Sequence, residues 1–149
     1  AKKWFPERFA AVADRLSGES GAQTILFGSA GDREGTVAVQ GSARHPLIDI
    51  AGMTNLKEAI ALIARCSLFI SNDSGLMHIA GALGIPTIAL FGSTNPVTTS
   101  PVGEQSVVIH HDVDCSPCLK PVCPTDFRCM EMIGVEEVCA AARKLLSIE

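Results

Sequence analysis

The 149-residue chain has the composition of a folded domain. Apolar residues make up 47% of it and charged residues 19%, which excludes disorder, collagen and a coiled coil. The formal net charge of −4 excludes a broad electropositive surface, so we expect no nucleic-acid partner. No apolar stretch reaches the ~20 residues that cross a bilayer, and no secretory signal opens the chain, so no integral membrane protein is expected. The chain begins at Ala1 without a starting methionine, which favours a domain cut from a longer protein.

The first part of the chain predicts a helix, two strands and a connection between them. Apolar residues recur every three or four positions over 5–17, which predicts a helix that ends at Gly18. Short apolar runs at 23–27 and 47–50 predict buried strands. If these strands are parallel, a crossover helix is required within 32–46.

Strands and helices continue to alternate in the rest of the chain. Asn55 followed by Glu58 has the spacing of a capping box and predicts a helix from Leu56. Further strands are predicted at 68–71, 87–91 and 106–110, and further helices at 76–83 and 135–146. Short, continuously apolar strands that alternate with helices are typical of an α/β fold. We therefore expect a Rossmann-like parallel sheet with helices on both faces.

Ligands of such sheets gather beyond the carboxyl ends of the strands, so the segments that follow strands are candidate sites. The most informative is the turn 72–75. Ser74 and Gly75 lie where a helix begins, so its free N–H groups suit an anion, and Gly75 lets a diphosphate approach without a Cβ in the way. His78 follows one turn later, and its imidazole can reach the same anion.

Two residues of this turn also have simpler interpretations. A carboxylate beside a diphosphate is repulsive, so Asp73 is expected to accept hydrogen bonds from sugar hydroxyls or from N–H groups of the turn, or to be only an N-cap. His78 is equally consistent with a half-buried histidine bonded to the backbone. No Walker loop is present, and Gly28 with Gly31 falls short of the dinucleotide fingerprint. The residues alone indicate an anion- or nucleotide-binding domain.

The run ISNDSGLMHIA at 70–80 resembles the nucleotide-sugar domain of ADP-heptose:lipopolysaccharide heptosyltransferases. These enzymes belong to glycosyltransferase family 9 and have the two-domain GT-B architecture. The D-S-G-x-x-H core at 73–78 is the specific part, and the likeness extends from the N-terminal Ala-Lys-Lys-Trp to the cysteine-rich end. The resemblance implies that residues 1–149 are a single donor-binding domain, the C-terminal half of a two-domain enzyme.

The resemblance also implies a reaction and a location. Heptose is transferred from ADP-heptose, with inversion, to the inner core of lipopolysaccharide at the cytoplasmic face of the bacterial inner membrane, where peripheral association of the full-length enzyme is expected. The catalytic base and the acceptor site belong to the missing N-terminal domain, so no residue of this chain is assigned as the base. Family members of this kind need no divalent metal or other cofactor, and the chain has no D-x-D motif.

Donor-binding roles follow from the positions that match the family. These positions are Lys2 at the donor phosphates, Met53 beside the adenine, Ser29 at the ribose or adenine, and Asp73, Ser74, Gly75 and His78 at the diphosphate and heptose. An ammonium suits a diphosphate, and a thioether is an adaptable wall for a purine. Without the resemblance, Lys2 is a solvated charge and Met53 a core residue.

Six cysteines fall into two groups. Cys66 and Cys139 are predicted to be inert core thiols. The loop 112–130 carries the other four, Cys115, Cys118, Cys123 and Cys129. Their spacing permits a structural zinc site, although it is looser than in zinc ribbons. Reduced or partly oxidised structural thiols and a redox role are the alternatives.

Two other functions remain open for the whole chain. One is a nucleotide-sugar epimerase of similar GT-B shape, which would bind a uridine nucleotide. The other is a non-enzymatic module that binds a nucleotide or zinc. The identity of the bound nucleotide separates these functions from heptosyl transfer.

Overall fold

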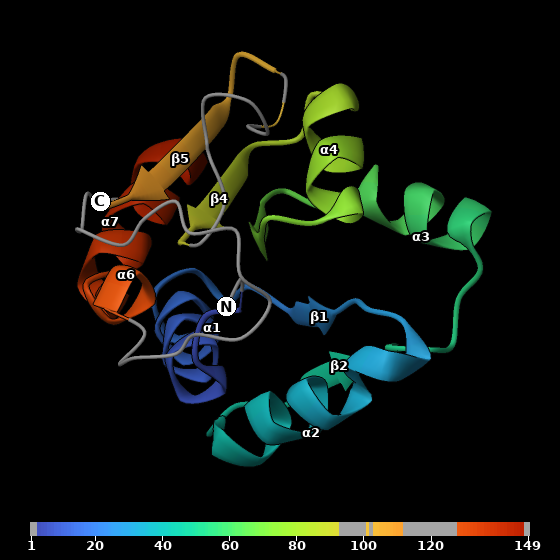
Figure 1. Ribbon diagram of the computed structural model, residues 1–149, viewed down its shortest axis with the longest axis horizontal. Coiled ribbons are helices and arrows are strands. Elements are labelled where there is room, and N and C mark those ends of the chain that lie inside the picture. The colour runs from blue at the N-terminus through green and yellow to red at the C-terminus, as the bar shows by residue number, and fades with distance from the viewer. Residues whose placement is uncertain (1–2, 93–100, 102, 112–127, 148–149) are drawn as a thin grey trace. The chain divides into compact units, whose positions relative to one another are not determined.

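The computed structural model describes residues 3–92, 101, 103–111 and 128–147 (Figure 1). The chain divides into two compact units. The N-terminal unit is Phe5–Leu62, and the C-terminal unit combines Ala1–Trp4 with Ile63–Glu149.

The N-terminal unit is built from helices and a pair of parallel strands. Its elements are α1 (Pro6–Ser20), β1 (Thr24–Leu26), the short 3-10 helix η1 (Ala30–Asp32), α2 (Arg33–Ser42), β2 (Leu47–Asp49) and most of α3 (Leu56–Ile63). β1 and β2 pair in parallel, with Ile25 opposite Ile48. The crossover helix expected between the two strands is confirmed as α2.

The first helix is longer than the sequence predicted. α1 continues through Gly18 to Ser20, and Gly21 ends it with a left-handed φ of 71°. The N–H of Gly21 donates to the carbonyl of Ser17 at 2.9 Å. The prediction that Gly18 ends the helix is wrong, because an exposed glycine costs a helix only about 1 kcal/mol, whereas a left-handed backbone stops it outright.

In this unit, the strand β2 is packed on one face only. Ala10 and Ala13 of α1, Val39 of α2 and Leu47 of β2 form its core. Side chains alternate along a strand, and Ile48, the neighbour of Leu47, is 47% exposed. The expectation of buried strands is therefore wrong for this pair, since β1 is only half-buried as well.

A carboxylate of α1 binds the segment that follows α2. Asp14 accepts hydrogen bonds from the backbone N–H groups of Arg44 at 2.9 Å and His45 at 2.9 Å, and its Oδ1 lies 3.1 Å from the imidazole Nδ1 of His45. Burial raises the pKa of Asp14, but these hydrogen bonds outweigh it, so the pKa lies below its ordinary value. The charged form of Asp14 is therefore the stabilising one.

We expect Asp14→Asn to lower the free energy of unfolding by about 2 kcal/mol at neutral pH, because a hydrogen bond to a charged acceptor contributes about 1.5–3 kcal/mol. A lowered folded-state pKa gives stability above the unfolded pKa that is lost as the pH falls through the folded one. Urea unfolding at about pH 7 and about pH 2.5 should thus show the difference between wild type and variant disappearing in acid. Glu19→Gln, which changes an exposed carboxylate 4.0 Å from Arg15, is the control. A difference that persists in acid contradicts the assignment.

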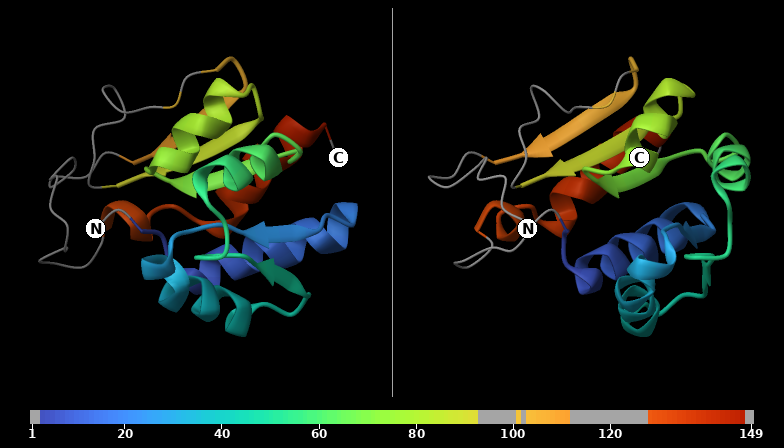
Figure 2. Two further views of the ribbon diagram at one scale, coloured as in Figure 1. Left: turned by 90° about the vertical axis from the view of Figure 1, so that its right-hand side faces the viewer. Right: turned by 45° about the vertical axis from the view of Figure 1, so that its right-hand side comes forward.

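The C-terminal unit contains a three-stranded parallel sheet. Its elements are β3 (Phe69–Asn72), α4 (Gly75–Ala82), β4 (Thr87–Phe91), β5 (Ser106–His110), α6 (Arg128–Glu131) and α7 (Val135–Leu146). The strand order is β3-β4-β5, and every residue of the central strand β4 is buried. Figure 2 shows α4 and α7 on opposite sides of this sheet. Met77 of α4 packs with Ala89 and Phe91 of β4 in the core.

These observations confirm the predicted fold class, an α/β protein with parallel strands and helices packed against them. The described strands hydrogen-bond as two sheets, one in each unit. Among the described helices, none combines the length and the apolar composition needed to cross a membrane.

Candidate functional site

The turn between β3 and α4 is held by serine hydroxyls. Ser74 has an extended backbone (φ −153°, ψ 166°) and is the N-cap of α4, where its Oγ accepts from the N–H of Met77 at 3.4 Å. Ser71 Oγ donates to the carbonyl of Asn72 at 2.6 Å and lies 2.9 Å from Ser74 Oγ. The helix start is therefore stabilised without the carboxylate of Asp73.

Asp73 and His78 do not have the purely structural roles considered for them. The interpretation of Asp73 as the N-cap is wrong, since Ser74 has that position. A half-buried histidine is also wrong, since His78 is exposed. Within the described part of the chain, neither side chain makes a hydrogen bond or an ion pair. Both are available to a ligand.

Space for an anion lies in front of Gly75. This glycine is exposed, and a Cβ added to it would meet no atom of the described residues within 4 Å. It is the first residue of α4, so its N–H and that of Leu76 have no partner inside the helix and carry the positive end of the helix dipole. Open space, free N–H groups and an imidazole one turn away form a site suited to a phosphate or diphosphate.

A buried tryptophan ties the chain before α1 to this turn. The backbone N–H of Trp4 donates to Oδ1 of Asn72 at 2.8 Å, and its indole Nε1–H donates to the carbonyl of Ile133 at 3.0 Å. The side chain is 2% exposed. Sequence reasoning missed this link, for which the sole tryptophan of the chain beside two lysines was the available signal. Lys2, the predicted phosphate ligand, lies outside the described residues.

The loops that follow β1 and β2 in the N-terminal unit pack tightly together. Gly52 donates its N–H to the carbonyl of Gly28 at 2.8 Å. Gly52 has a φ of 74°, and a Cβ on it would lie 3.0 Å from Cα of Ala30. Glycine at this position therefore allows the close approach of the two loops.

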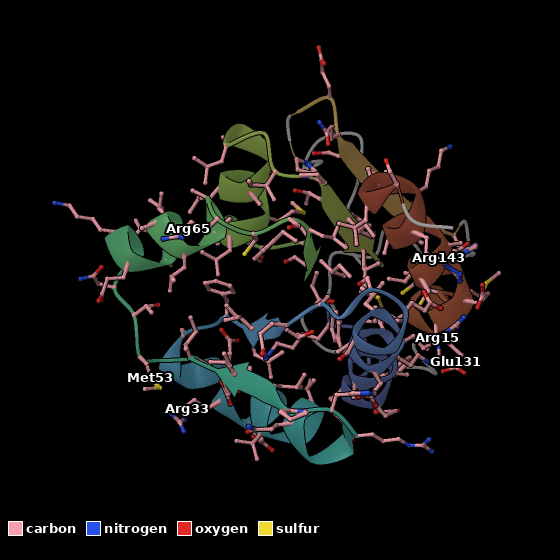
Figure 3. All side chains as sticks on the ribbon, turned by 180° about the vertical axis from the view of Figure 1, so that it is seen from behind. Arg15, Arg33, Met53, Arg65, Glu131 and Arg143 are labelled. Carbon is pink, nitrogen blue, oxygen red and sulfur yellow. The ribbon has the colours of Figure 1, made fainter. Side chains whose placement is uncertain are left out.

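Ser29 and Met53 occupy these two loops. The N–H and hydroxyl of Ser29 both contact Oδ2 of Asp32, at 2.8 and 3.0 Å, so this hydroxyl already has an acceptor within its own turn. Met53 is 65% exposed, which makes its assignment to the core wrong. In Figure 3 its side chain points outward from the unit, as does that of Arg33. The exposed thioether fits a ligand-contacting role.

The predicted binding residues thus fall into two groups, one in each unit. Asp73, Ser74, Gly75 and His78 share the start of α4 in the C-terminal unit. Ser29 and Met53 belong to adjoining loops of the N-terminal unit.

The described cysteines are buried or half-buried and do not form a metal-binding cluster. Cys139 is fully buried, as predicted, whereas Cys66 is half-buried, and burial raises the pKa of its thiol. Cys129 is 3% exposed, and a Cβ on Gly92 would lie 3.0 Å from its Sγ. Cys115, Cys118 and Cys123 lie outside the described residues. Within the residues described, no three His, Cys, Asp or Glu side chains are grouped to hold a metal.

Comparisons with known proteins identify the family of this chain. Residues 1–127 match the family described as Glycosyltransferase family 9 (heptosyltransferase). The chain is 42% identical over 113 residues to lipooligosaccharide heptosyltransferase 2 of Haemophilus influenzae, which covers 73% of this chain and 32% of that protein.

Two solved structures are similar over nearly the whole chain. The structure of E. coli ADP-heptose lps heptosyltransferase II gives a TM-score of 0.85 at 32% identity and covers 99% of this chain and 43% of that one. A glycosyl transferase family 9 protein of Veillonella parvula DSM 2008 gives a TM-score of 0.86 at 33% identity and covers 98% of this chain and 42% of that one. The chain therefore spans less than half the length of each of these relatives. Since the family match takes in most of the sequence, this chain belongs to glycosyltransferase family 9.

Proposed function

We propose that this chain is the donor-binding domain of a glycosyltransferase that moves heptose from ADP-heptose to the inner core of lipopolysaccharide. The observation that carries the proposal is the start of α4, where Gly75 faces open space and His78 is exposed one turn later. Such a place suits the diphosphate of a nucleotide sugar. Support comes from the E. coli relative, whose name specifies ADP-heptose, and from the H. influenzae relative, a lipooligosaccharide heptosyltransferase.

Each residue of the site has a role in this proposal. The N–H groups of Gly75 and Leu76, together with His78, bind the diphosphate, and Asp73 accepts hydrogen bonds from heptose hydroxyls. Lys2 contributes a cation at the phosphates, Met53 lies against the adenine, and the Ser29 turn contacts the ribose or adenine.

The chemical contribution of this domain is electrostatic. Negative charge builds up on the departing ADP as the glycosidic bond breaks, and donors that are already oriented toward the diphosphate lower the energy of that transition state. The positive end of the α4 helix dipole also stabilises this negative charge. The base that activates the acceptor and the acceptor site are contributed by an N-terminal domain, so residues 1–149 form the C-terminal half of the enzyme.

The remaining expectations are part of the same proposal. The enzyme works in the cytoplasm at the inner face of the inner membrane, where it meets its lipopolysaccharide acceptor by peripheral association. The transfer requires no cofactor. A structural zinc bound by Cys115, Cys118, Cys123 and Cys129 stays a hypothesis for the loop 112–130, of which only residues 128–130 are described.

A thermal-shift panel of ADP, UDP, GDP and CMP tests the proposal. We expect ADP to raise the melting temperature of the chain most, since a ligand at 100 times its Kd stabilises a protein by about 2.7 kcal/mol. Gly75→Ala should abolish this shift without lowering the melting temperature, because the new methyl group enters open space that the diphosphate needs. Gly41→Ala, a substitution within α2 that also meets no atom within 4 Å, is the matched control and should keep the shift.

The other outcomes identify the competing functions. A preference for UDP would favour the epimerase-like alternative. Indifference to all four nucleotides would refute a donor-binding domain and favour the non-enzymatic module. An ADP shift that survives in Gly75→Ala would place the diphosphate elsewhere.

A further inference from the structure

Arg33 is anchored to the loop that presents Met53. It is the first residue of α2 and directly follows the Ser29–Asp32 turn. Its Nη1 donates to the carbonyl of Ala51 at 3.3 Å, two residues before Met53. This hydrogen bond holds the guanidinium beside the loop. Most N–H groups of the guanidinium and its planar face remain available to a ligand.

The surroundings of this guanidinium show what it is free to do. Arg33 is exposed, and within the described residues its side chain forms no ion pair and one hydrogen bond, the one to Ala51. Met53 is likewise exposed at 65%. Figure 3 shows both side chains directed outward from the N-terminal unit. A planar cation and a polarizable thioether on adjoining loops offer two surfaces that attract a flat aromatic ligand.

We propose that Arg33 is a specificity-determining residue for the base of the donor nucleotide, with its guanidinium plane stacking on a purine that also contacts Met53. This inference rests on the proposed function, because it assumes that the nucleotide of the donor lies at these loops. A two-ring purine offers more π surface to a guanidinium than a one-ring pyrimidine does. The arrangement therefore favours ADP over UDP without any hydrogen bond to the base edge.

Arginine and lysine are not equivalent in this role. Stacking uses the planar, delocalised guanidinium, whereas a compact ammonium has no face to stack. A residue that only attracted a phosphate would function as either cation. Comparison of Arg33→Gln with Arg33→Lys therefore separates base stacking from phosphate attraction.

Isothermal titration of the 149-residue chain with ADP and with UDP tests the inference. We expect Arg33→Gln and Arg33→Lys each to weaken ADP binding by about threefold to tenfold, the range of a guanidinium stacked on an aromatic ring, and to change UDP binding less than about twofold. Arg44→Gln makes the same charge change in the segment after α2 and is the matched control. It should leave both affinities unchanged. Circular dichroism checks that the variants stay folded, as expected for an exposed side chain with one long hydrogen bond.

Each other outcome overturns the inference in a recognisable way. Equal losses for ADP and UDP, or wild-type affinity in Arg33→Lys, would assign Arg33 to the phosphates. Unchanged ADP binding in Arg33→Gln would remove Arg33 from the site and leave the proposed function intact. If the wild-type chain bound no ADP, the proposed function would fail, and the inference with it.

Discussion

Replacing Asp73 or His78 by alanine should lower heptosyl transfer by at least about tenfold, equivalent to ~1.4 kcal/mol of transition-state stabilisation, and leave the melting temperature nearly unchanged. Neither side chain makes a hydrogen bond or ion pair within the described residues, so folding loses little when either is removed. On the proposed function, we expect the loss to affect donor binding and the stabilisation of negative charge on the departing ADP. The rate is measured with ADP-heptose and a lipopolysaccharide acceptor, in the complete protein that carries this sequence.

Asn55→Ala is a control for these variants, because it should affect stability rather than activity. Asn55 Oδ1 accepts from the N–H of Glu58 at 2.8 Å, and the carboxylate of Glu58 accepts from the N–H of Asn55 at 2.9 Å. Loss of this capping box should cost about 1 kcal/mol of stability and spare the transfer rate. If Asp73→Ala instead lowered the melting temperature and kept the rate, Asp73 would be a structural residue of its turn.

Trp4→Ala is expected to lower the free energy of unfolding by about 3–5 kcal/mol, the largest stability effect that we predict for a single substitution. The substitution removes a side chain that is 2% exposed and leaves a cavity in its place. It also removes the indole N–H that donates to the carbonyl of Ile133. Trp4→Phe keeps most of the apolar volume and should cost about 1–3 kcal/mol, mainly from the lost hydrogen bond of the indole N–H to the carbonyl of Ile133. Urea unfolding followed by circular dichroism measures both values.

Both tryptophan variants keep the group that binds Asn72. The link to Asn72 uses the backbone N–H of Trp4, which any residue except proline provides. A folded Trp4→Phe chain should therefore keep its ADP-induced thermal shift. Met132→Ala, at a side chain that is 50% exposed, should change stability by less than about 0.5 kcal/mol and serves as the control. A cost below about 1 kcal/mol for Trp4→Ala would contradict the anchoring role.

Features that depend on neighbouring residues were predictable from the sequence. The capping box of α3 forms as expected because its two hydrogen bonds join residues three positions apart. The helix α7 has Glu136 and Glu137 in its first turn and Arg143 and Lys144 in its last, the order that the helix dipole favours. The D-S-G-x-x-H turn belongs to the same class, since β3, the turn and α4 are consecutive in the chain.

Local signals did not decide which of two adjacent polar residues caps α4. Asp73 and Ser74 are both good N-cap residue types, and the backbone angles of the turn give the position to Ser74. The carboxylate of Asp73 therefore has no capping role. The same kind of limit applies to Gly18, whose helix continues because the left-handed backbone comes three residues later, at Gly21.

By itself, the sequence determined the order of helices and strands, the parallel α/β class and the turn between β3 and α4, because periodicity, caps and glycines act over a few residues. Only the tertiary structure decided which distant groups meet. Trp4 binds Asn72 across 68 positions, and Arg33 binds Ala51 across 18. It also decided that Met53 is exposed although its side chain is apolar. Burial and long-range hydrogen bonds depend on how elements pack, and no pattern within a short stretch of residues specifies that packing.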